Sequence, residues 1–291
     1  MAFLQIDHVS KYFLNRDGPS SPPAPTNLFC VFRDVALNIA KGEFVTMVGH
    51  SGCGKSTLLN IMAGFEPPSE GGVILEGKEV TGSGLDRMVV FQNFALMPWL
   101  SAFDNVRIAV KAAYPSWDKP QIQAYTQKYL NLMGLQGAEY KKPPLLSGGM
   151  RQRVGLARAF AVQPKVLLLD EPFAQIDALT RGIIQDELIK MWEATHTTVF
   201  MVTHDVDEAI GLSDRIALMT TGPNARLADC VTVNIPRPRQ RATLIDLPEY
   251  IRLRNHVLHF LMRGAHAPPE RSSPGAPLNH RGPDTRADLA S

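Results

Sequence analysis

The sequence predicts an α/β fold in which helices wind around both faces of a mostly parallel sheet. Short, apolar, β-favouring runs alternate with stretches of helical periodicity along most of the chain. The runs at residues 166–169 and 198–202 are continuously apolar, as expected of parallel strands that are buried on both faces. A glycine-rich loop joins a third run, residues 44–48, to a helical stretch. This order of strand, loop and helix is typical of phosphate-binding α/β domains.

The bulk properties fit one large α/β domain or two small ones. The chain has 291 residues, a hydrophobic content of 45% and a net charge of +2. This charge supplies no basic field, so we expect no nucleic-acid partner. Cys30, Cys53 and Cys230 are far apart and form no C-x-x-C pair, which suits a reducing compartment and predicts neither a metal nor a disulfide framework.

The sequence contains no recognisable targeting or membrane segment. Residues 1–8 lack the layout of a signal peptide. No apolar run approaches the roughly 20 residues that cross a bilayer. We therefore expect a cytoplasmic protein that reaches a membrane only through a partner.

The first part of the chain predicts mainly strands. A strand over residues 3–9 ends at two aromatics, and a surface loop rich in Pro, Ser and Gly follows at 15–27. Strands at 30–39 and 43–48 flank a turn at Lys41-Gly42. The helix at 58–63 stops at Gly64 and Pro67-Pro68, and short strands are expected at 71–75 and 88–91.

The next segment, residues 92–146, predicts a helical insertion because nothing in it resembles a central strand. One short helix is expected within 101–112, and a second begins near Asp118 and ends at Gly134. Apolar residues recur along this second helix at helical spacing, which favours core packing over a ligand site. They are Ile122, Tyr125, Tyr129, Leu130 and Met133.

The last part predicts two more helices and an unstructured tail. Asp177 caps a helix whose apolar face comprises Ile183, Ile184, Leu188, Met191 and Trp192. A strand at 215–219 and a helix at 247–262 follow. Beyond residue 263 the Pro, Gly, Arg and Ser content predicts disorder.

The phosphate-binding loop fits G-x-x-x-x-G-K-[ST] at every fixed position. Its glycines let backbone N–H groups converge on an anion, and the following helix adds its partial positive charge. Lys55 would reach the β- and γ-phosphates, and the Ser56 hydroxyl would ligate Mg²⁺. The alternative is a chance match in a turn. The loop reads Gly49-His50-Ser51-Gly52-Cys53-Gly54-Lys55-Ser56-Thr57.

A second motif, Leu146-Ser147-Gly148-Gly149, precedes the strand that ends in Asp170-Glu171. A serine and two glycines at a helix start offer a hydroxyl and free N–H donors, which make a second anion site. The two carboxylates would hold Mg²⁺ and accept a proton from water, or serve only as caps or as a solvated turn. In this order the motifs resemble the nucleotide-binding subunit of ATP-binding cassette (ABC) transporters over roughly residues 1–263.

The resemblance implies a P-loop NTPase fold with a mostly parallel core sheet, an antiparallel β subdomain and an inserted α-helical subdomain at about 93–162. It implies an ATP-binding domain over 1–235, a short C-terminal extension with a helix over 236–263, and a disordered tail over 264–291. It also implies a head-to-tail dimer that encloses two ATP molecules. Each nucleotide is then held by the phosphate loop of one copy and the Ser147 helix end of the other.

The resemblance also implies the site residues, with ATP and Mg²⁺ as cofactors. Glu171 accepts the proton, Gln92 touches Mg²⁺ and the attacking water, and His204 contacts the γ-phosphate. Mg²⁺ is held by Ser56, Gln92 and Asp170. Phe13 stacks on adenine, with Tyr12 as the alternative ring. The nucleotide-binding set is Phe13, Gly49, His50, Ser51, Gly52, Cys53, Gly54, Lys55, Ser56, Thr57, Ser147, Gly148, Gly149 and Asp177.

The sequence departs from the family pattern at a few positions. Met150 stands where glutamine is commoner, which should alter helix packing more than phosphate contact. Gln175 and Ile176 precede Asp177 in place of the usual residues, so communication across the dimer differs in detail. Cys53 contributes chiefly its backbone.

The resemblance is strongest to bacterial importers. Residues 92–100 and 146–153 resemble the branch for nitrate, nitrite, cyanate and sulfonates such as taurine, and residues 235–239 and 248–255 resemble its nitrate and cyanate members. The implied partners are a second ATPase subunit, identical or related, two membrane permeases and an extracytoplasmic solute-binding protein. The subunit would lie on the cytoplasmic face of the cell membrane.

Residues 94–100 would receive a permease helix, with Met97 and Trp99 either exposed for it or buried within the subunit. Taurine import, a soluble ABC ATPase that acts on DNA or ribosomes, and a metabolite kinase are the alternatives for the whole protein. The soluble class carries long insertions or tandem cassettes. A kinase would have no use for the serine–glycine motif.

Overall fold

The computed structural model describes residues 2–14 and 28–263. In chain order the elements are β1 (Leu4–Leu14), β2 (Leu28–Ile39), β3 (Phe44–Val48), α1 (Lys55–Ala63), β4 (Glu70–Leu75), β5 (Lys78–Glu79), β6 (Arg87–Val90), α2 (Ala102–Ala113), α3 (Lys119–Leu132), the 3-10 turn η1 (Pro143–Leu145), α4 (Gly148–Ala161), β7 (Val166–Asp170), α5 (Ala178–Thr195), β8 (Thr198–Thr203), α6 (Val206–Leu212), β9 (Arg215–Met219), β10 (Leu227–Thr232), α7 (Arg241–Leu244) and α8 (Pro248–Met262).

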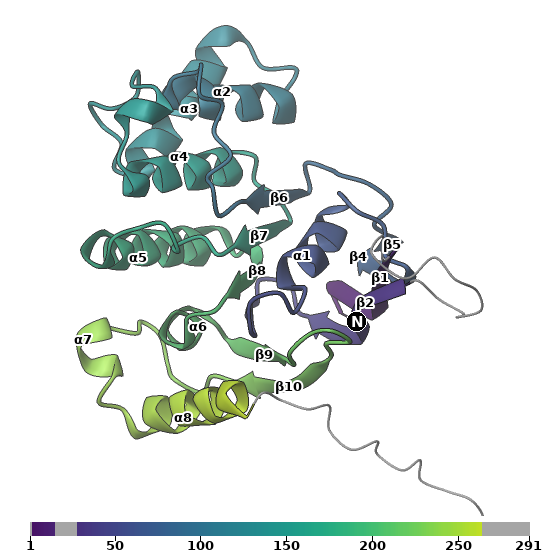
Figure 1. The fold of residues 1–291 in the computed structure, drawn as a ribbon. Coiled ribbons are helices and arrows are strands. Elements are labelled where there is room, and N and C mark those ends of the chain that lie inside the picture. Colours follow the sequence, from purple (N-terminus) through teal and green to yellow (C-terminus); the bar gives the residue numbers. More distant parts are fainter. Residues whose placement is uncertain (1, 15–27, 264–291) are drawn as a thin grey trace, which may run out of the picture.

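The main sheet has the strand order β10-β9-β3-β8-β7-β6 (Figure 1). Its strands run parallel except β10, which pairs antiparallel with β9 at one edge. The predicted α/β class with a mostly parallel core is therefore confirmed. All carboxyl ends of the parallel strands point to the same edge, which is where ligands bind in such sheets.

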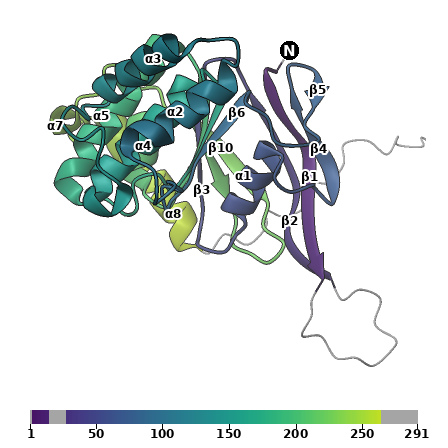
Figure 2. The ribbon, with the colours of Figure 1, turned by 90° about the horizontal axis from the view of Figure 1, so that it is seen from above.

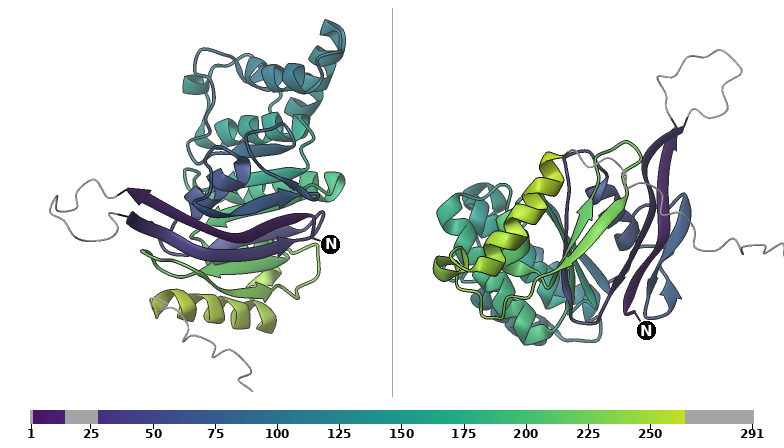
Figure 3. Two further views of the ribbon diagram at one scale, coloured as in Figure 1. Left: turned by 90° about the vertical axis from the view of Figure 1, so that its right-hand side faces the viewer. Right: turned by 90° about the horizontal axis from the view of Figure 1, so that it is seen from below.

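A second sheet, of order β2-β1-β4-β5, is antiparallel throughout. Its two long strands, β1 and β2, lie side by side across the molecule in the left panel of Figure 3. The prediction that the first strand ends at two aromatics was wrong. Tyr12 and Phe13 pair with Cys30 and Phe29, so β1 continues to Leu14.

Strand side chains alternate between two cores, as a pleated sheet requires. Leu168 and Phe200 face the core that contains α1 and the antiparallel sheet. Leu167 and Met201 face the other core, which contains α4 and α5. A third core, under α6 and α8, closes the edge near β9 and β10. The main sheet is thus covered on both faces.

Helices α2, α3 and α4 gather at one end of the molecule (Figures 1 and 2). Asp118 caps α3 as predicted, in a capping box with Gln121. Of the predicted stripe, Tyr129, Leu130 and Met133 are buried, so its assignment to core packing is confirmed.

Other sequence predictions need correction. Ile183 is 54% exposed, so the apolar face of α5 is narrower than its periodicity suggested. The two-residue strand β5, the antiparallel edge strand β10 and the short helix α7 were not predicted. The predicted loop at 15–27 and tail at 264–291 lie outside the described residues. In the part of the chain that the structure describes, no helix is both long and apolar enough for a membrane span.

Candidate nucleotide-binding site

The phosphate loop connects β3 to α1 at the carboxyl edge of the main sheet. Gly52 and Gly54 have φ values of 80° and 99°, in the left-handed region that favours glycine. A Cβ atom on Gly54 would lie 2.6 Å from Cγ1 of Val31. Glycine at this position therefore lets the loop pass close to β2. Gly54, the N-cap of α1, makes no side-chain cap hydrogen bond, so the first N–H groups of the helix are available to an anion.

Lys55 is held over this loop by the loop's own carbonyls. Its Nζ donates hydrogen bonds to the carbonyl oxygen of Gly49 at 2.7 Å and to that of His50 at 3.0 Å. Only 6% of Lys55 is exposed, so its ammonium group is held within the loop. The His50 ring nitrogen Nε2 lies 2.7 Å from the carbonyl oxygen of Leu261, which ties the loop to the end of α8.

Ser56 and Asp170 meet at the end of β7, where Ser56 Oγ donates to Asp170 Oδ1 at 2.8 Å. Burial raises the pKa of Asp170, and the neighbouring charge of Glu171 raises it further. Both side chains supply oxygen, the donor that Mg²⁺ prefers. No group of three or more His, Cys, Asp or Glu that could hold a metal occurs among the residues described. Ser56 and Asp170 could hold Mg²⁺ beside a bound nucleotide, whose phosphate oxygens and water are further ligands of the kind that Mg²⁺ prefers.

Glu171 follows Asp170 in a strained conformation, with a φ of 44°. Its backbone N–H donates to the carbonyl oxygen of Val202 at 3.0 Å, which anchors it beside β8. Nδ1 of His204, just beyond β8, lies 3.1 Å from Glu171 Oε2. A positive φ at a non-glycine residue marks backbone that its surroundings must hold, as is common at functional sites.

Gln92 and Phe13 are both exposed. Gln92 follows β6, whose Val90 pairs with Leu169 one residue before Asp170. Phe13 is 41% exposed, and Lys11 Nζ lies 5.0 Å from the centre of its ring. The hydroxyl of Tyr12 is already bonded to Glu70 at 3.3 Å. Stacking on adenine by Phe13 stays a prediction.

The second motif lies against α5 and not against the phosphate loop. Ser147 caps α4 by accepting a hydrogen bond from the N–H of Met150 at 3.2 Å. A Cβ on Gly149 would lie 2.5 Å from Thr180 Cγ2, and one on Gly148 would lie 2.9 Å from the carbonyl oxygen of Gln175. Both glycines therefore permit the close approach of α4 to α5 and the segment before it.

Asp177 belongs to this second group because it caps α5. It accepts a hydrogen bond from the N–H of Thr180 at 3.0 Å, and this bond lowers its pKa. Within the described residues no hydrogen bond joins this group to the phosphate loop. The Lys55 loop and the Ser147 helix end thus form two separate groups in one chain, and both stay predicted anion sites.

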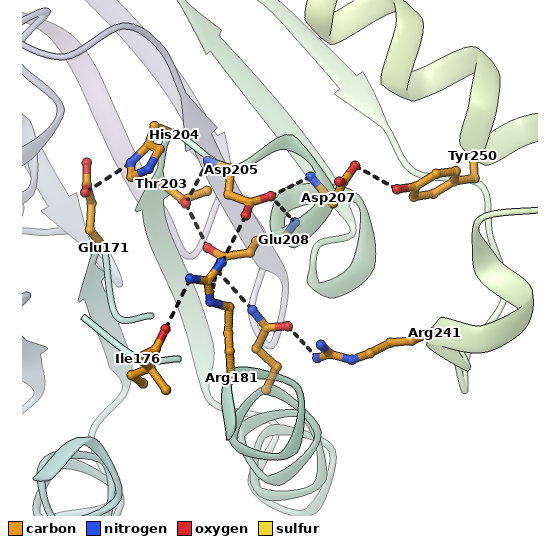
Figure 4. A network of polar contacts seen from close by, with 11 residues as sticks. Glu171, Ile176, Arg181, Thr203, His204, Asp205, Asp207, Glu208, Arg241 and Tyr250 are labelled. Carbon is orange, nitrogen blue, oxygen red and sulfur yellow. Dashed lines mark hydrogen bonds and ion pairs between the residues drawn. The ribbon is translucent and has the colours of Figure 1, made fainter. Parts of the chain in front are cut away.

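A polar network behind His204 was missed at the sequence level (Figure 4). Glu208 Oε2 accepts a hydrogen bond from Thr203 Oγ1 at 2.8 Å, and Arg181 reaches the same region from α5. Asp205 caps α6 through the N–H groups of Asp207 and Glu208. The acidic residue three positions after a capping Asp was a usable sign of the helix start, but nothing local indicated Arg181.

Strand, glycine loop, helix N-terminus and strand-end carboxylates together define a nucleotide-binding P-loop domain. Comparison with known proteins narrows this class. A profile of the family described as ABC transporter matches residues 32–174. The nitrate import ATP-binding protein NrtD of Synechococcus elongatus is 46% identical over 261 residues, 90% of this chain and 92% of that protein. The chain belongs to the ABC transporter ATP-binding family, as the motifs predicted.

Other proteins are similar to most of this chain. The bicarbonate transport ATP-binding protein CmpD of Synechocystis is 46% identical over 89% of each chain. The nitrate import ATP-binding protein NrtC of Synechocystis is 47% identical over 90% of this chain. The matched residues make up 38% of NrtC, so this chain spans less than half of that protein's length. A dimeric structure of the cassette MJ0796 is 29% identical, with a TM-score of 0.70 over 80% of this chain and all of that one.

Proposed function

We propose that this chain is the ATP-hydrolysing subunit of a bacterial importer for a small inorganic anion, with nitrate or the related nitrite as the favoured cargo. The observation that carries the proposal is the combination of a complete cassette with 46% identity to a nitrate import ATP-binding protein over nearly the whole of both chains. Bicarbonate is the second candidate, because CmpD is equally similar. Cyanate and taurine rest only on the sequence resemblance.

The chain's own residues supply the steps of hydrolysis. The loop N–H groups and Lys55 bind the β- and γ-phosphates. Ser56 and Asp170, together with Gln92, would hold Mg²⁺, which when bound would supply positive charge against the phosphates. Glu171 accepts the proton of the attacking water, while His204 orients Glu171 and contacts the γ-phosphate. Phe13 supports adenine by stacking.

Two copies are needed for a complete site. The Ser147 helix end lies against α5, so it is free to meet a nucleotide held by another chain. The similar cassette MJ0796 is described as dimeric in two structures, one of them bound to ADP and Pi. We propose the same head-to-tail pairing, with Gly148, Gly149 and Asp177 contributed across the interface. The partner is a second copy or a related ATPase subunit.

Residues 94–100 are proposed as the contact for a permease. Trp99 is 69% exposed, whereas Phe94 is buried and anchors the segment. Two permeases and an extracytoplasmic binding protein would complete the importer, and the subunit would lie at the cytoplasmic membrane face. We propose that the chain is organised as an ATP-binding cassette at 1–235, a C-terminal extension at 236–263 and a tail at 264–291.

Uptake measurements test the cargo directly. Cells that lack this chain should lose uptake of labelled nitrate, and the wild-type gene but not a Glu171→Gln variant should restore it. Loss of bicarbonate uptake alone would select the second candidate. Unchanged uptake of both anions would contradict the proposed importer.

A further inference from the structure

Arg181, in the second turn of α5, joins the two segments that flank the proposed hydrolytic site. Its Nη2 donates a hydrogen bond to the carbonyl oxygen of Ile176 at 3.2 Å. Its Nη1 lies 3.5 Å from Asp205 Oδ2, in the segment that carries His204. A planar guanidinium with several donors suits such bridging, because one side chain can contact acceptors from different elements.

The residues near Arg181 form hydrogen bonds with the two chain neighbours of His204, Thr203 and Asp205. Asp205 directly follows His204, and its own N–H donates to Thr203 Oγ1 at 3.1 Å. Thr203, directly before His204, donates to Glu208. Glu208 also accepts from Gln185 Nε2 at 3.1 Å. The backbone of His204 is therefore fixed by neighbours that Arg181 contacts or approaches.

One donor of Arg181 is unused. Its Nε is buried and has no hydrogen-bond partner among the described residues. Oε1 of Glu208 lies 3.9 Å from this Nε, beyond hydrogen-bond distance. Both side chains line a cavity of about 710 Å³, which leaves room for them to move. A buried unpaired donor costs free energy, so a small shift that closes this gap would be favourable.

We propose that Arg181 is a positioning residue that couples the 173–177 segment to His204 and, through His204, to Glu171. This inference rests on the proposed function, in which the 173–177 segment meets the partner subunit. When the partner moves this segment, the carbonyl of Ile176 moves Arg181. Arg181 then closes on Glu208 and sets the orientation of the His204 backbone. The sequence departs from the family pattern at Gln175 and Ile176, and the carbonyl of Ile176 is the group that Arg181 contacts.

The test compares Arg181→Met and Arg181→Lys with Arg252→Met, a control in the exposed Arg252–Glu249 pair of α8. Arg181→Met should lower the kcat of ATP hydrolysis about tenfold and leave the KM for ATP within about twofold, because no hydrogen bond joins the Arg181 side chain to the phosphate loop among the described residues. Arg181→Lys retains the positive charge but lacks the planar guanidinium with its several N–H donors. Its kcat should therefore lie between those of Arg181→Met and the wild type. Arg252→Met should match the wild type.

Two further readouts separate positioning from a structural role. In a Glu171→Gln background, Arg181→Met should still form the ATP-dependent dimer, and its thermal midpoint should stay close to that of the parent. An unchanged kcat in Arg181→Met, or a fall in kcat accompanied by equal losses of dimer and folded protein in both Arg181 variants, would overturn the inference. If the wild-type protein hydrolyses no ATP, the proposed function itself fails; wild-type hydrolysis with normal Arg181 variants contradicts the coupling alone.

Discussion

His204 Nδ1 lies 3.1 Å from Glu171 Oε2, so the carboxylate at the end of β7 and the imidazole at the end of β8 share one hydrogen bond. Glu171 has a positive φ of 44°, a backbone conformation that is rare for a non-glycine residue and common at functional sites. The contact joins two adjacent parallel strands at their carboxyl ends. Glu171, the proposed proton acceptor, is thus hydrogen-bonded to His204, the residue proposed to contact the γ-phosphate.

Glu171→Gln should retain ATP binding and lose turnover. The amide keeps a hydrogen-bonding side chain beside His204 but cannot accept a proton from water, so we expect kcat to fall by about 100-fold or more. Phosphate release measures turnover and a fluorescent ATP analogue measures binding. Glu79→Gln, on the exposed strand β5, is the matched control. Normal hydrolysis by Glu171→Gln would remove this residue as the base.

Lys55→Ala should weaken ATP binding by roughly 10- to 100-fold, because charge-assisted hydrogen bonds contribute about 1.5–3 kcal/mol. Isothermal titration calorimetry measures the affinity. Lys41→Ala removes an exposed lysine whose Nζ lies over the ring of Phe3 and should leave the affinity unchanged. Equal affinities for the two variants would contradict the phosphate role of Lys55.

Gly149→Ala should destabilise the fold by about 1–3 kcal/mol, the usual cost of overpacking. The new methyl would lie 2.5 Å from Thr180 Cγ2 and force α4 away from α5. Urea unfolding measures the change, and the double variant Gly149→Ala/Thr180→Ala should recover part of it because the clashing methyl is removed. If the single and double variants are equally unstable, the contact with Thr180 is not the cause.

The raised pKa of Glu208 predicts that the free energy of unfolding changes with pH near neutrality. Burial, reinforced by the charge of Asp205, raises its pKa from 4.5 to about 7 in the folded protein. The folded state therefore binds this proton more tightly than the unfolded state does, and this contribution to stability is lost as the pH rises from about 4.5 through 7. The free energy of unfolding should fall by up to about 3 kcal/mol across this window.

Glu208→Gln should abolish this part of the pH dependence, because it keeps the side-chain shape but carries no titrating proton. Urea unfolding at pH 5 and pH 8 gives the comparison. The control Glu193→Gln removes a surface carboxylate of α5 and should keep the wild-type slope. The same slope in Glu208→Gln would assign the dependence to another group.

The local parts of the site were predictable from sequence because they depend on short-range rules. Glycines at 52 and 54, the lysine after them and the capping Asp177 are each set by a turn or a helix end. Buried strands were predictable because continuous apolar runs have few other uses in an α/β domain. Their order in the sheet was not predicted, because it depends on pairing between distant segments.

Contacts between distant segments were not predictable. Arg181 lies in a helix whose local pattern gives no reason for it to approach Asp205. Tyr12 and Phe13 resembled a strand end until their pairing with β2 placed them inside a longer strand. Ile183 has the spacing of a core residue but is more than half exposed on α5. Tertiary packing decides these cases.

The central claim is that each ATP is held between two copies, one supplying Lys55 and the other Ser147. Light scattering on the purified Glu171→Gln protein with ATP and Mg²⁺ tests it most directly. We expect a particle of twice the chain mass of 32.1 kDa, which Ser147→Arg should reduce to a single chain. A protein that binds ATP yet stays a single chain, both in isolation and with its permease, would contradict the account.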